Sequence, residues 1–332
     1  MPLVVAPGVR RIPLPLPLAL RIVTVYLVEG AHGWSLVDSG LHTAEAEAAL
    51  DAALTDNGIA RADVRHLFVT HLHPDHIGMA GVLLRTGTRV TMHRPELTNA
   101  IRDWSDDEGM ANMAYAHFAR HGMPRANDDA MKAAWLAMAS GVAPFAGVAT
   151  VEDRELVDLE GRACRALWTP GHTDYHAALF DEADGTLLAG DHVLPKITSN
   201  VGYYSHSRPD PLGDFLSSLR ELAVLPVKRV LPAHGEPFDD LAGRVEQLLV
   251  HHAERLEACL AALESGSRTA WDVCLVLFPK LRSAHEERFA IAETLAHLRH
   301  LEATGRATSD ESRPVVWRAG PGTVPPRRRG AS

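Results

Sequence analysis

The sequence predicts an α/β protein, and three observations support this fold class. Apolar runs of strand length alternate with segments of helical periodicity through most of the chain. Several of the runs end in a glycine or proline turn, as strands at a sheet edge do. The length of 332 residues is enough for one large domain and a smaller one.

The strands and helices can be assigned in chain order. Alternating or continuous apolar runs predict strands at Ile22–Glu29, Trp34–Asp38, His66–Val69, Arg89–Met92, Ala163–Leu167, His176–Phe180, Thr186–Ala189 and Lys228–Leu231. The first two form a hairpin, and Asp184-Gly185 predicts another hairpin turn. Helical periodicity predicts helices at Thr43–Leu54, His76–Leu84 and Pro211–Leu222.

The apolar N-terminal run, Ile12–Leu18, contains three prolines. Proline breaks the helical apolar region that a signal peptide needs, and the run is too short to span a bilayer. We therefore expect an extended edge segment that leads into the first strand. No other segment of the sequence predicts a membrane span.

Two further stretches are helical in composition. Residues 95–142 are rich in Ala and Met and contain several aromatic residues, which predicts an inserted helical pair with its own small core, a lid over the site, or both. Helices at Leu241–Ser265, Thr269–Leu277 and Glu286–Thr304, followed by an extended piece near Pro314–Trp317, predict a small C-terminal unit. We expect domains at 1–250 and 251–319, and a disordered tail at 320–332.

Composition restricts the function and the compartment. A net charge of −9 disfavours a general nucleic-acid surface, so we expect no nucleic-acid partner. Cys164, Cys259 and Cys274 are far apart, with no metal-binding or disulfide spacing. This pattern suits a reducing cytoplasm, where we expect the protein.

The stretch from Thr70 to His76 carries the strongest chemical signal. It places three imidazoles and one carboxylate directly after a predicted buried strand. His71 and His73 are two residues apart, so an extended chain directs both side chains to the same side. Pro74 suits a first helical position, which places Asp75 and His76 at a helix start. These are ligand types for zinc, iron and manganese, so one turn could serve two metal ions; a histidine-rich surface loop is the alternative.

Three later segments repeat the arrangement of an apolar strand, a Gly or Pro turn and a ligand-type side chain. They contribute His172, Asp191 and His234. Each segment alone is as easily explained by a turn or capping role. Together with the first motif they predict a metal centre mounted on rigid sheet edges.

These motifs, in this order, resemble the metallo-β-lactamase-fold hydrolase superfamily, over about Arg21 to Val250. The resemblance implies a four-layer αββα sandwich. It also implies that His71, His73 and His172 hold one metal, that Asp75, His76 and His234 hold a second, and that Asp191 bridges them. We expect two Zn²⁺, with Fe or Mn as alternatives. Many members of the superfamily have a pair of glycines shortly after the last histidine of this motif, whereas here Gly78 is followed by Met79. This difference lies outside the ligands, so it affects the assignment to a subfamily and not the predicted metal site.

The branch resembled is that of glyoxalase II and β-lactamase-like protein 2, and the C-terminal unit then resembles a winged helix. That unit lacks a concentrated basic helix, so we expect it to serve packing or dimerisation, with a homodimer as one outcome.

The expected mechanism is metal-assisted hydrolysis in which a hydroxide shared by the metals attacks a carbonyl or phosphoryl centre. Asp75 and Asp191 are the candidate catalytic residues: Asp75 binds the water and transfers a proton, and Asp191 sets the distance between the metals. Imidazole ligands need hydrogen-bond partners that fix their tautomers. Asp38 is one candidate for this task, although a turn role explains it equally well.

The preferred substrate is a small thioester, ester or lactone, as in hydroxyacylglutathione hydrolase and acyl-homoserine lactonase relatives. A β-lactam is less favoured, because no secretion signal is evident. Phosphodiester cleavage by an endoribonuclease is an alternative that the acidic balance disfavours. An iron-dependent sulfur dioxygenase is another, whose relatives use the positions of His71, His172 and Asp191. A redox flavo-diiron protein is disfavoured, because those relatives carry Glu at the position of His73. A non-enzymatic binding module is also disfavoured, because the ligand set is complete.

Other polar residues near the motifs are weaker candidates. The loop after Asp191 could supply an oxyanion donor or a substrate contact through Lys196, Asn200, Tyr203, Tyr204 or His206. His176 and His192 adjoin ligand segments, and we expect them to support the site or the core. His251 and His252 are expected to be surface or packing residues.

Overall fold

The structure, a computed structural model, describes residues 3–125, 128–264, 266–310 and 312–321. Its contacts divide the chain into two compact units. The first comprises the chain up to Met110, Trp135–Ser199 and Asp214–Gln247. The second comprises Ala111–Ala134, Asn200–Gly213 and the chain from Leu248 onward. The domain boundaries and the disordered tail stay predictions, and the tail from residue 322 onward lies outside the described residues.

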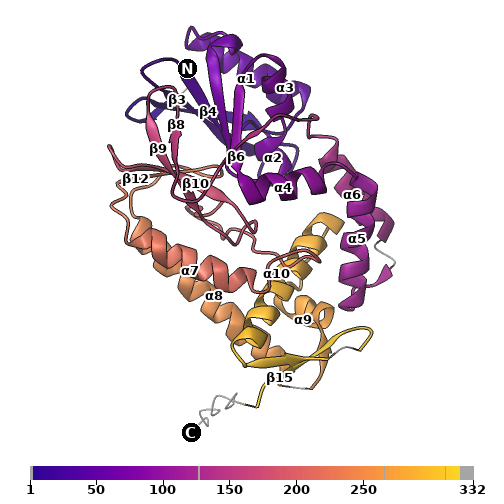
Figure 1. Cartoon of the computed structure of the whole chain (residues 1–332). Coiled ribbons are helices and arrows are strands. Elements are labelled where there is room, and N and C mark those ends of the chain that lie inside the picture. Colours follow the sequence, from indigo (N-terminus) through magenta and orange to yellow (C-terminus); the bar gives the residue numbers. More distant parts are fainter. Residues whose placement is uncertain (1–2, 126–127, 265, 311, 322–332) are drawn as a thin grey trace. The chain divides into compact units, whose positions relative to one another are not determined.

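The first unit contains two β-sheets (Figure 1). One follows the chain order β1 (Leu3–Ala6), β2 (Val9–Pro15), β3 (Ile22–Glu29), β4 (Trp34–Val37), β5 (Val64–Val69), β6 (Arg89–His93) and β7 (Ala149–Val151). The other has the order β12 (Arg229–Pro232), β11 (Thr186–Gly190), β10 (Ala177–Asp181), β9 (Ala163–Trp168) and β8 (Leu156–Asp158). Each of the eight predicted strands is confirmed to within two residues at either end.

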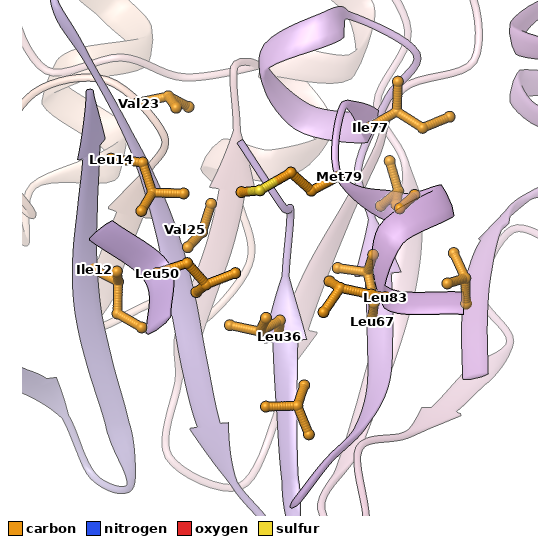
Figure 2. Close-up of a cluster of buried hydrophobic side chains, with 14 of the residues drawn as sticks. Ile12, Leu14, Val23, Val25, Leu36, Leu50, Leu67, Ile77, Met79 and Leu83 are labelled. Carbon is orange, nitrogen blue, oxygen red and sulfur yellow. The ribbon is translucent and has the colours of Figure 1, made fainter. Parts of the chain in front are cut away.

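Alternation along the strands builds two apolar cores, because successive side chains point to opposite faces. Val23, Val25 and Leu27 of β3 face a core that includes Leu50 of α1 (Ala44–Asp56). Figure 2 shows Val23, Val25 and Leu50 with other members of this core, which include Leu36, Leu67 and Met79. Tyr26 and Val28 belong to the opposite core, with side chains of the second sheet such as Leu179 and Leu231.

Helices cover the outer face of each sheet (Figure 1). α1 and α3 (Ala80–Arg85) pack on the first sheet, and Phe215 of α7 (Pro211–Ala223) contacts the turn that follows β9. The predicted layers of helix, sheet, sheet and helix are confirmed. The single helix predicted at His76–Leu84 is wrong, because α2 (Pro74–Ile77) ends at Gly78 and Met79 caps α3.

At this break the backbone is bonded to other segments: the N–H of Met79 donates to the carbonyl of Gly40, and the carbonyl of Gly78 accepts from the N–H of Ala143. A Cβ on Gly78 would lie 2.4–2.7 Å from three backbone carbonyl oxygens, including those of Pro74 and Gly40. The backbone passes too close to other segments here for any side chain. The side chain of the next residue, Met79, is buried in the first core.

The proline-containing N-terminal run forms β2. Its partner β1 pairs only with Val9–Arg11, whereas β3 pairs along the whole strand. The predicted extended edge segment is therefore confirmed for Ile12–Pro15, which pairs with β3 alone, whereas β1 forms the edge beside Val9–Arg11. Among the described residues, the stretch with Pro13 and Pro15 still has an unpaired outer side, which is where a strand tolerates a missing N–H donor.

The helical insertion is not a pair. It forms α4 (Arg94–Asp103), α5 (Asp107–Arg120) and α6 (Asp128–Ala139), and residues 111–134 belong to the second unit. The second unit also contains most of α8 (Leu241–Leu263), α9 (Ala270–Leu277), α10 (Ala284–Ala303) and a small sheet of β13 (Arg268–Thr269), β15 (Val316–Ala319) and β14 (Ala307–Ser309). The winged-helix likeness of this unit stays a prediction.

Within the described residues, no helix has the length and apolar character that a membrane span requires.

Candidate metal centre

Two turns at the carboxyl ends of strands bring three imidazoles together in the first unit. The turn between β5 and α2 carries His71 and His73, and the turn after β9 carries His172. Nδ1 of His73 lies 3.1 Å from Nε2 of His71 and 2.9 Å from Nε2 of His172. These three nitrogens form one group of atoms that lie within 4.8 Å of one another.

A second group lies beside the first. Asp75 and His76, in the first turn of α2, face His234, which follows β12. Oδ2 of Asp75 lies 3.7 Å from Nε2 of His76 and 3.3 Å from Nε2 of His234. These side chains are buried or nearly so.

Asp191, at the end of β11, connects the two groups. Its Oδ2 lies 3.5 Å from Nε2 of His172 and 3.6 Å from Nε2 of His76. Nε2 of His234 is 3.5 Å from the same oxygen. One carboxylate oxygen is therefore within reach of imidazoles from both groups, so the structure brings all seven predicted ligands together.

Hydrogen bonds on the outer side of the imidazoles fix their orientation. Nδ1–H of His76 donates to Asp38 Oδ2 over 2.8 Å. Asp38 also accepts from the backbone N–H of Thr70 and from its hydroxyl, whose oxygen lies 3.0 Å from Nδ1 of His71. His234 Nδ1–H donates to the carbonyl of Ile22. These bonds leave Nε2 of each ring available toward the centre.

Asp38 therefore supports ligands of both groups, directly at His76 and through Thr70 at His71. It adopts a φ of 63°, which is uncommon for a residue other than glycine. These contacts agree with the interpretation of Asp38 as a partner of the predicted ligand imidazoles, whose metal binding stays a prediction.

His176 and His192 were predicted to support the site or the core, and the His176 ring centroid lies 5.1 Å from that of His71. Both rings are fully buried. His176 Nδ1 lies 2.7 Å from the Thr169 hydroxyl, and His192 Nε2 lies 2.9 Å from that of Ser218. A Cβ on Gly190 would lie 2.5 Å from Nε2 of His176, so only glycine lets β11 end here with Asp191 in place.

The two groups differ in their electrostatics. Burial, together with the neighbouring imidazoles, holds the pKa of His71 and His73 well below its usual value. Burial has the same effect on His76, but the carboxylates of Asp191, Asp38 and Asp75 outweigh it and hold the pKa of His76 well above the usual value. Burial raises the pKa of Asp75, yet His76 and His234 bring it down to about 2. Asp75 is therefore ionised at neutral pH.

The arrangement fits divalent cations. Nε2 of His76 and Oδ1 of Asp191 are buried and make no hydrogen bond within the described part of the chain. Buried polar atoms without such partners often face an ion. The distances of 3.3–3.7 Å between Asp191, Asp75 and the imidazoles are close to the ~3.3 Å expected between two ligands of a tetrahedral ion with bonds of about 2.0–2.1 Å.

The weaker candidates have other surroundings. Lys196 is exposed on the loop after β11. Asn200 donates to Glu293 in the second unit, and the Arg299 guanidinium lies over the Tyr203 ring. Tyr204 stacks on His206. A substrate contact by these residues stays a prediction. His252 is buried, which agrees with a packing role.

Several supporting residues were not predicted. Thr70 directly precedes His71, and its position at the strand end was an available signal. Glu96 is fully buried and accepts hydrogen bonds from the backbone N–H of Leu72 and the hydroxyl of Thr173. Burial raises the pKa of Glu96 to about 8, against the effect of these bonds. An acidic residue in the first turn of a helix is so common that its sequence position gave no signal.

Comparison with known proteins agrees with this geometry. A family model described as "Metallo-beta-lactamase superfamily" matches residues 18–234, and one described as "Metallo-beta-lactamase-like, C-terminal domain" matches residues 256–320. The "Probable metallo-hydrolase YqjP" of Bacillus subtilis is 30% identical over 303 residues, which cover 89% of this chain and 92% of that protein.

A solved structure and a second relative extend the comparison. The crystal structure of "metallo-beta-lactamase family protein TTHA1429" from Thermus thermophilus has a TM-score of 0.85 and 38% identity, over 94% of this chain and 99% of that one. The "Atrochrysone carboxyl ACP thioesterase AgnL7" of Paecilomyces divaricatus is 26% identical over 215 residues, which cover 64% of this chain and 52% of that protein.

Proposed function

This chain belongs to the metallo-beta-lactamase superfamily and is a metal-dependent hydrolase; from this premise we propose that it uses two divalent cations to hydrolyse a small thioester, ester or lactone. The observation that carries the proposal is the position of Asp191 Oδ2, 3.5 Å from Nε2 of His172 and 3.6 Å from Nε2 of His76. A carboxylate oxygen shared by two ligand groups is suited to two ions a few ångströms apart.

The proposed ligand assignment follows the two groups. His71, His73 and His172 hold one cation, and Asp75, His76 and His234 hold the other. Asp191 serves both. Zinc suits this set of nitrogen and oxygen ligands, and iron or manganese would be accepted by the same atoms.

The residues of the chain prepare the site before the substrate arrives. Asp38, Thr70 and the Ile22 carbonyl fix the rings so that their inner nitrogens converge. When bound, the cations lower the pKa of a coordinated water and polarise the scissile carbonyl. Asp75 is ionised at neutral pH, since its pKa is about 2. We propose that a carboxylate oxygen of Asp75 accepts a proton from the attacking water and passes it to the leaving group.

Two observations favour an acyl substrate over a nucleic acid. The net charge of −9 works against the long-range attraction of a polyanion. A relative that matches about two thirds of this chain is named as a thioesterase that acts on an acyl-carrier-protein substrate. We propose a thioester as the first substrate class to examine.

The test combines metal analysis with a panel of substrates. We expect two equivalents of zinc per chain and turnover of thioesters in a panel that also contains lactones, phosphodiesters and β-lactams. One iron per chain with oxygen uptake on a persulfide would identify a dioxygenase instead, and RNA cleavage that depends on His73 would identify a nuclease.

Variants at the shared ligand sharpen the test. We expect Asp191→Ala and His172→Ala to lose metal and activity together, because each removes an atom from a ligand group. His32→Ala is the matched control, since His32 is exposed and lies outside the ligand turns. Full metal content and normal turnover in the Asp191 or His172 variant would refute the assignment.

A further inference from the structure

Helix α4, which opens the 95–142 insertion, lies beside β6 and α2 (Figure 1). Glu96 is in its first turn, and its side chain is fully buried. Oε1 of Glu96 accepts from the backbone N–H of Leu72 at 2.9 Å and from the hydroxyl of Thr173 at 2.7 Å. Oε2 accepts from the backbone N–H of Tyr175 at 3.1 Å. One carboxylate therefore joins two turns that are about a hundred residues apart.

The positions of these partners are informative. Leu72 lies between His71 and His73, and Thr173 directly follows His172. The three imidazoles of the first ligand group are thus carried by the two turns that Glu96 connects. Their nitrogens lie 2.9–3.1 Å apart through His73, so a small separation of the turns would open the group.

Residues at the two ends of α4 complete the contact. The indole N–H of Trp104 donates to the carbonyl of Leu72 at 2.8 Å. His93 Nδ1–H donates to the carbonyl of Tyr175, also at 2.8 Å. The backbone N–H groups of Leu72 and Tyr175 are therefore bonded to α4 itself, and their carbonyls are bonded to the two residues that flank it.

From this arrangement we propose that Glu96 is a positioning residue that sets the separation of the two turns carrying the first ligand group. His93, Glu96 and Trp104 together form what we call the α4 clamp. The start of the insertion then belongs to the metal-binding scaffold, whatever covers the substrate. The proposal rests on the proposed function, because it assumes that His71, His73 and His172 bind a cation.

The hydrogen bonds of Glu96 can be tested with a substitution that keeps the shape of the side chain. Whether ionised or protonated, the carboxyl group of Glu96 can accept from the N–H groups of Leu72 and Tyr175 at once, one on each oxygen. Glu96→Gln keeps the shape but replaces one oxygen with an NH₂ donor. In either orientation of the amide, one turn then loses an acceptor and meets a second donor, which leaves a buried N–H unpaired.

The experiment is a zinc titration of the metal-free protein against a chelator of known affinity. We expect Glu96→Gln to weaken one of the two binding equivalents by about 10–100-fold, the usual effect of losing an outer partner of a metal site, and to leave the other unchanged. Hydrogen exchange should show faster exchange at the amides of Leu72 or Tyr175. The absorption spectrum of the cobalt-loaded protein should change for the same equivalent.

Thr88→Val is the matched control. Thr88 is buried in the same unit and donates to the carbonyl of Val64, at the opposite end of β5 from the ligands. This variant also removes a buried hydrogen bond, but it should not change either zinc affinity. Should Glu96→Gln prove unable to fold, Trp104→Phe removes the bond to the Leu72 carbonyl, keeps an aromatic ring beside Trp135, and should weaken the same equivalent several-fold.

The outcomes separate the two proposals. Wild-type zinc affinities in Glu96→Gln, with only a loss of stability like that of Thr88→Val, would overturn the clamp and leave the proposed function intact. Two zinc equivalents in the wild type without turnover of any substrate would overturn the proposed function and leave the clamp intact. A wild type that binds no metal would overturn both.

Discussion

Two clusters of buried imidazoles differ in what surrounds their rings. In the first unit, the rings of His71, His76 and His234 are held from outside by Thr70, Asp38 and a backbone carbonyl, and their inner nitrogens converge on Asp191. In the second unit, His252 and His297 stack with centroids 5.3 Å apart.

The pair in the second unit is bonded within itself. Nδ1 of His252 lies 3.2 Å from Nε2 of His297, and Nδ1–H of His297 donates to the backbone carbonyl of Glu293, one turn earlier on α10. Among the described residues, no group of three possible ligand atoms includes either ring. Burial of neighbouring histidines is therefore not enough for a metal site; the inner nitrogens must also converge with a carboxylate.

The pKa values of the imidazoles also differ between the two clusters. Carboxylates hold the pKa of His76 well above its usual value although burial opposes them. In the pair, burial lowers the pKa of His252 to about 3 and that of His297 to about 4, and neighbouring cations such as Arg255 act in the same direction. The pair is neutral at physiological pH, whereas the carboxylates of the ligand cluster are charged.

The largest expected effect that distinguishes the two clusters is acid destabilisation by the pair. Above pH 6.5 both rings are neutral whether the chain is folded or unfolded, so they contribute no pH dependence. As the pH falls below 6.5, the unfolded chain binds protons that the folded chain excludes, which costs up to about 1.4 kcal/mol per ring and pH unit until the folded pKa is reached. Because the unfolded rings are only half protonated at pH 6.5, the pair should lower the free energy of unfolding by about 3 kcal/mol between pH 6.5 and 5.

Urea unfolding at a series of pH values measures this dependence. The control is the double variant His252→Leu/His297→Leu, in which the other titrating groups remain. Its free energy of unfolding should fall less steeply between pH 6.5 and 5. Equal slopes for the two proteins would mean that the pair does not exclude protons.

The contrast between the clusters also explains how much the sequence could predict. The strands were predictable because each carries its pattern locally, as in Val23, Val25 and Leu27, which alternate with residues of the other core. The ligands were predictable because His71, His73, Asp75 and His76 are contiguous and the others follow strands.

Residues that act through contacts between distant segments were not predictable. Glu96 meets Leu72 and Thr173 only in the folded chain, and its sequence position is that of an ordinary helix start. At the break between α2 and α3, the backbone of Gly78 and Met79 is bonded to distant segments, at Ala143 and Gly40. In the same way, periodicity could not show that the insertion is divided between the two units.

A smaller effect is expected from Asp38→Asn, which tests whether outer partners distinguish the ligand cluster. In one orientation the amide oxygen accepts from Thr70 and the NH₂ group faces Nδ1–H of His76. In the other orientation the oxygen accepts from His76 and the NH₂ group faces the N–H of Thr70. We expect zinc affinity and turnover to fall together by about 10–100-fold. Zinc titration and thioester turnover measure this, with His32→Ala as the exposed control; unchanged affinity would show that ring orientation does not depend on Asp38.

The smallest effect on zinc binding should come from His297→Gln, the counterpart of Asp38→Asn in the second unit. Glutamine cannot reproduce both the contact with His252 and the bond to the Glu293 carbonyl, so we expect a loss of stability of about 1–3 kcal/mol from a buried polar group left unpaired. Zinc content should stay at the wild-type number of equivalents, because the ring contributes no ligand. Metal analysis and urea unfolding of the same sample test both parts. Loss of a zinc equivalent would show that the pair binds metal, and the distinction drawn from converging carboxylates would then be wrong.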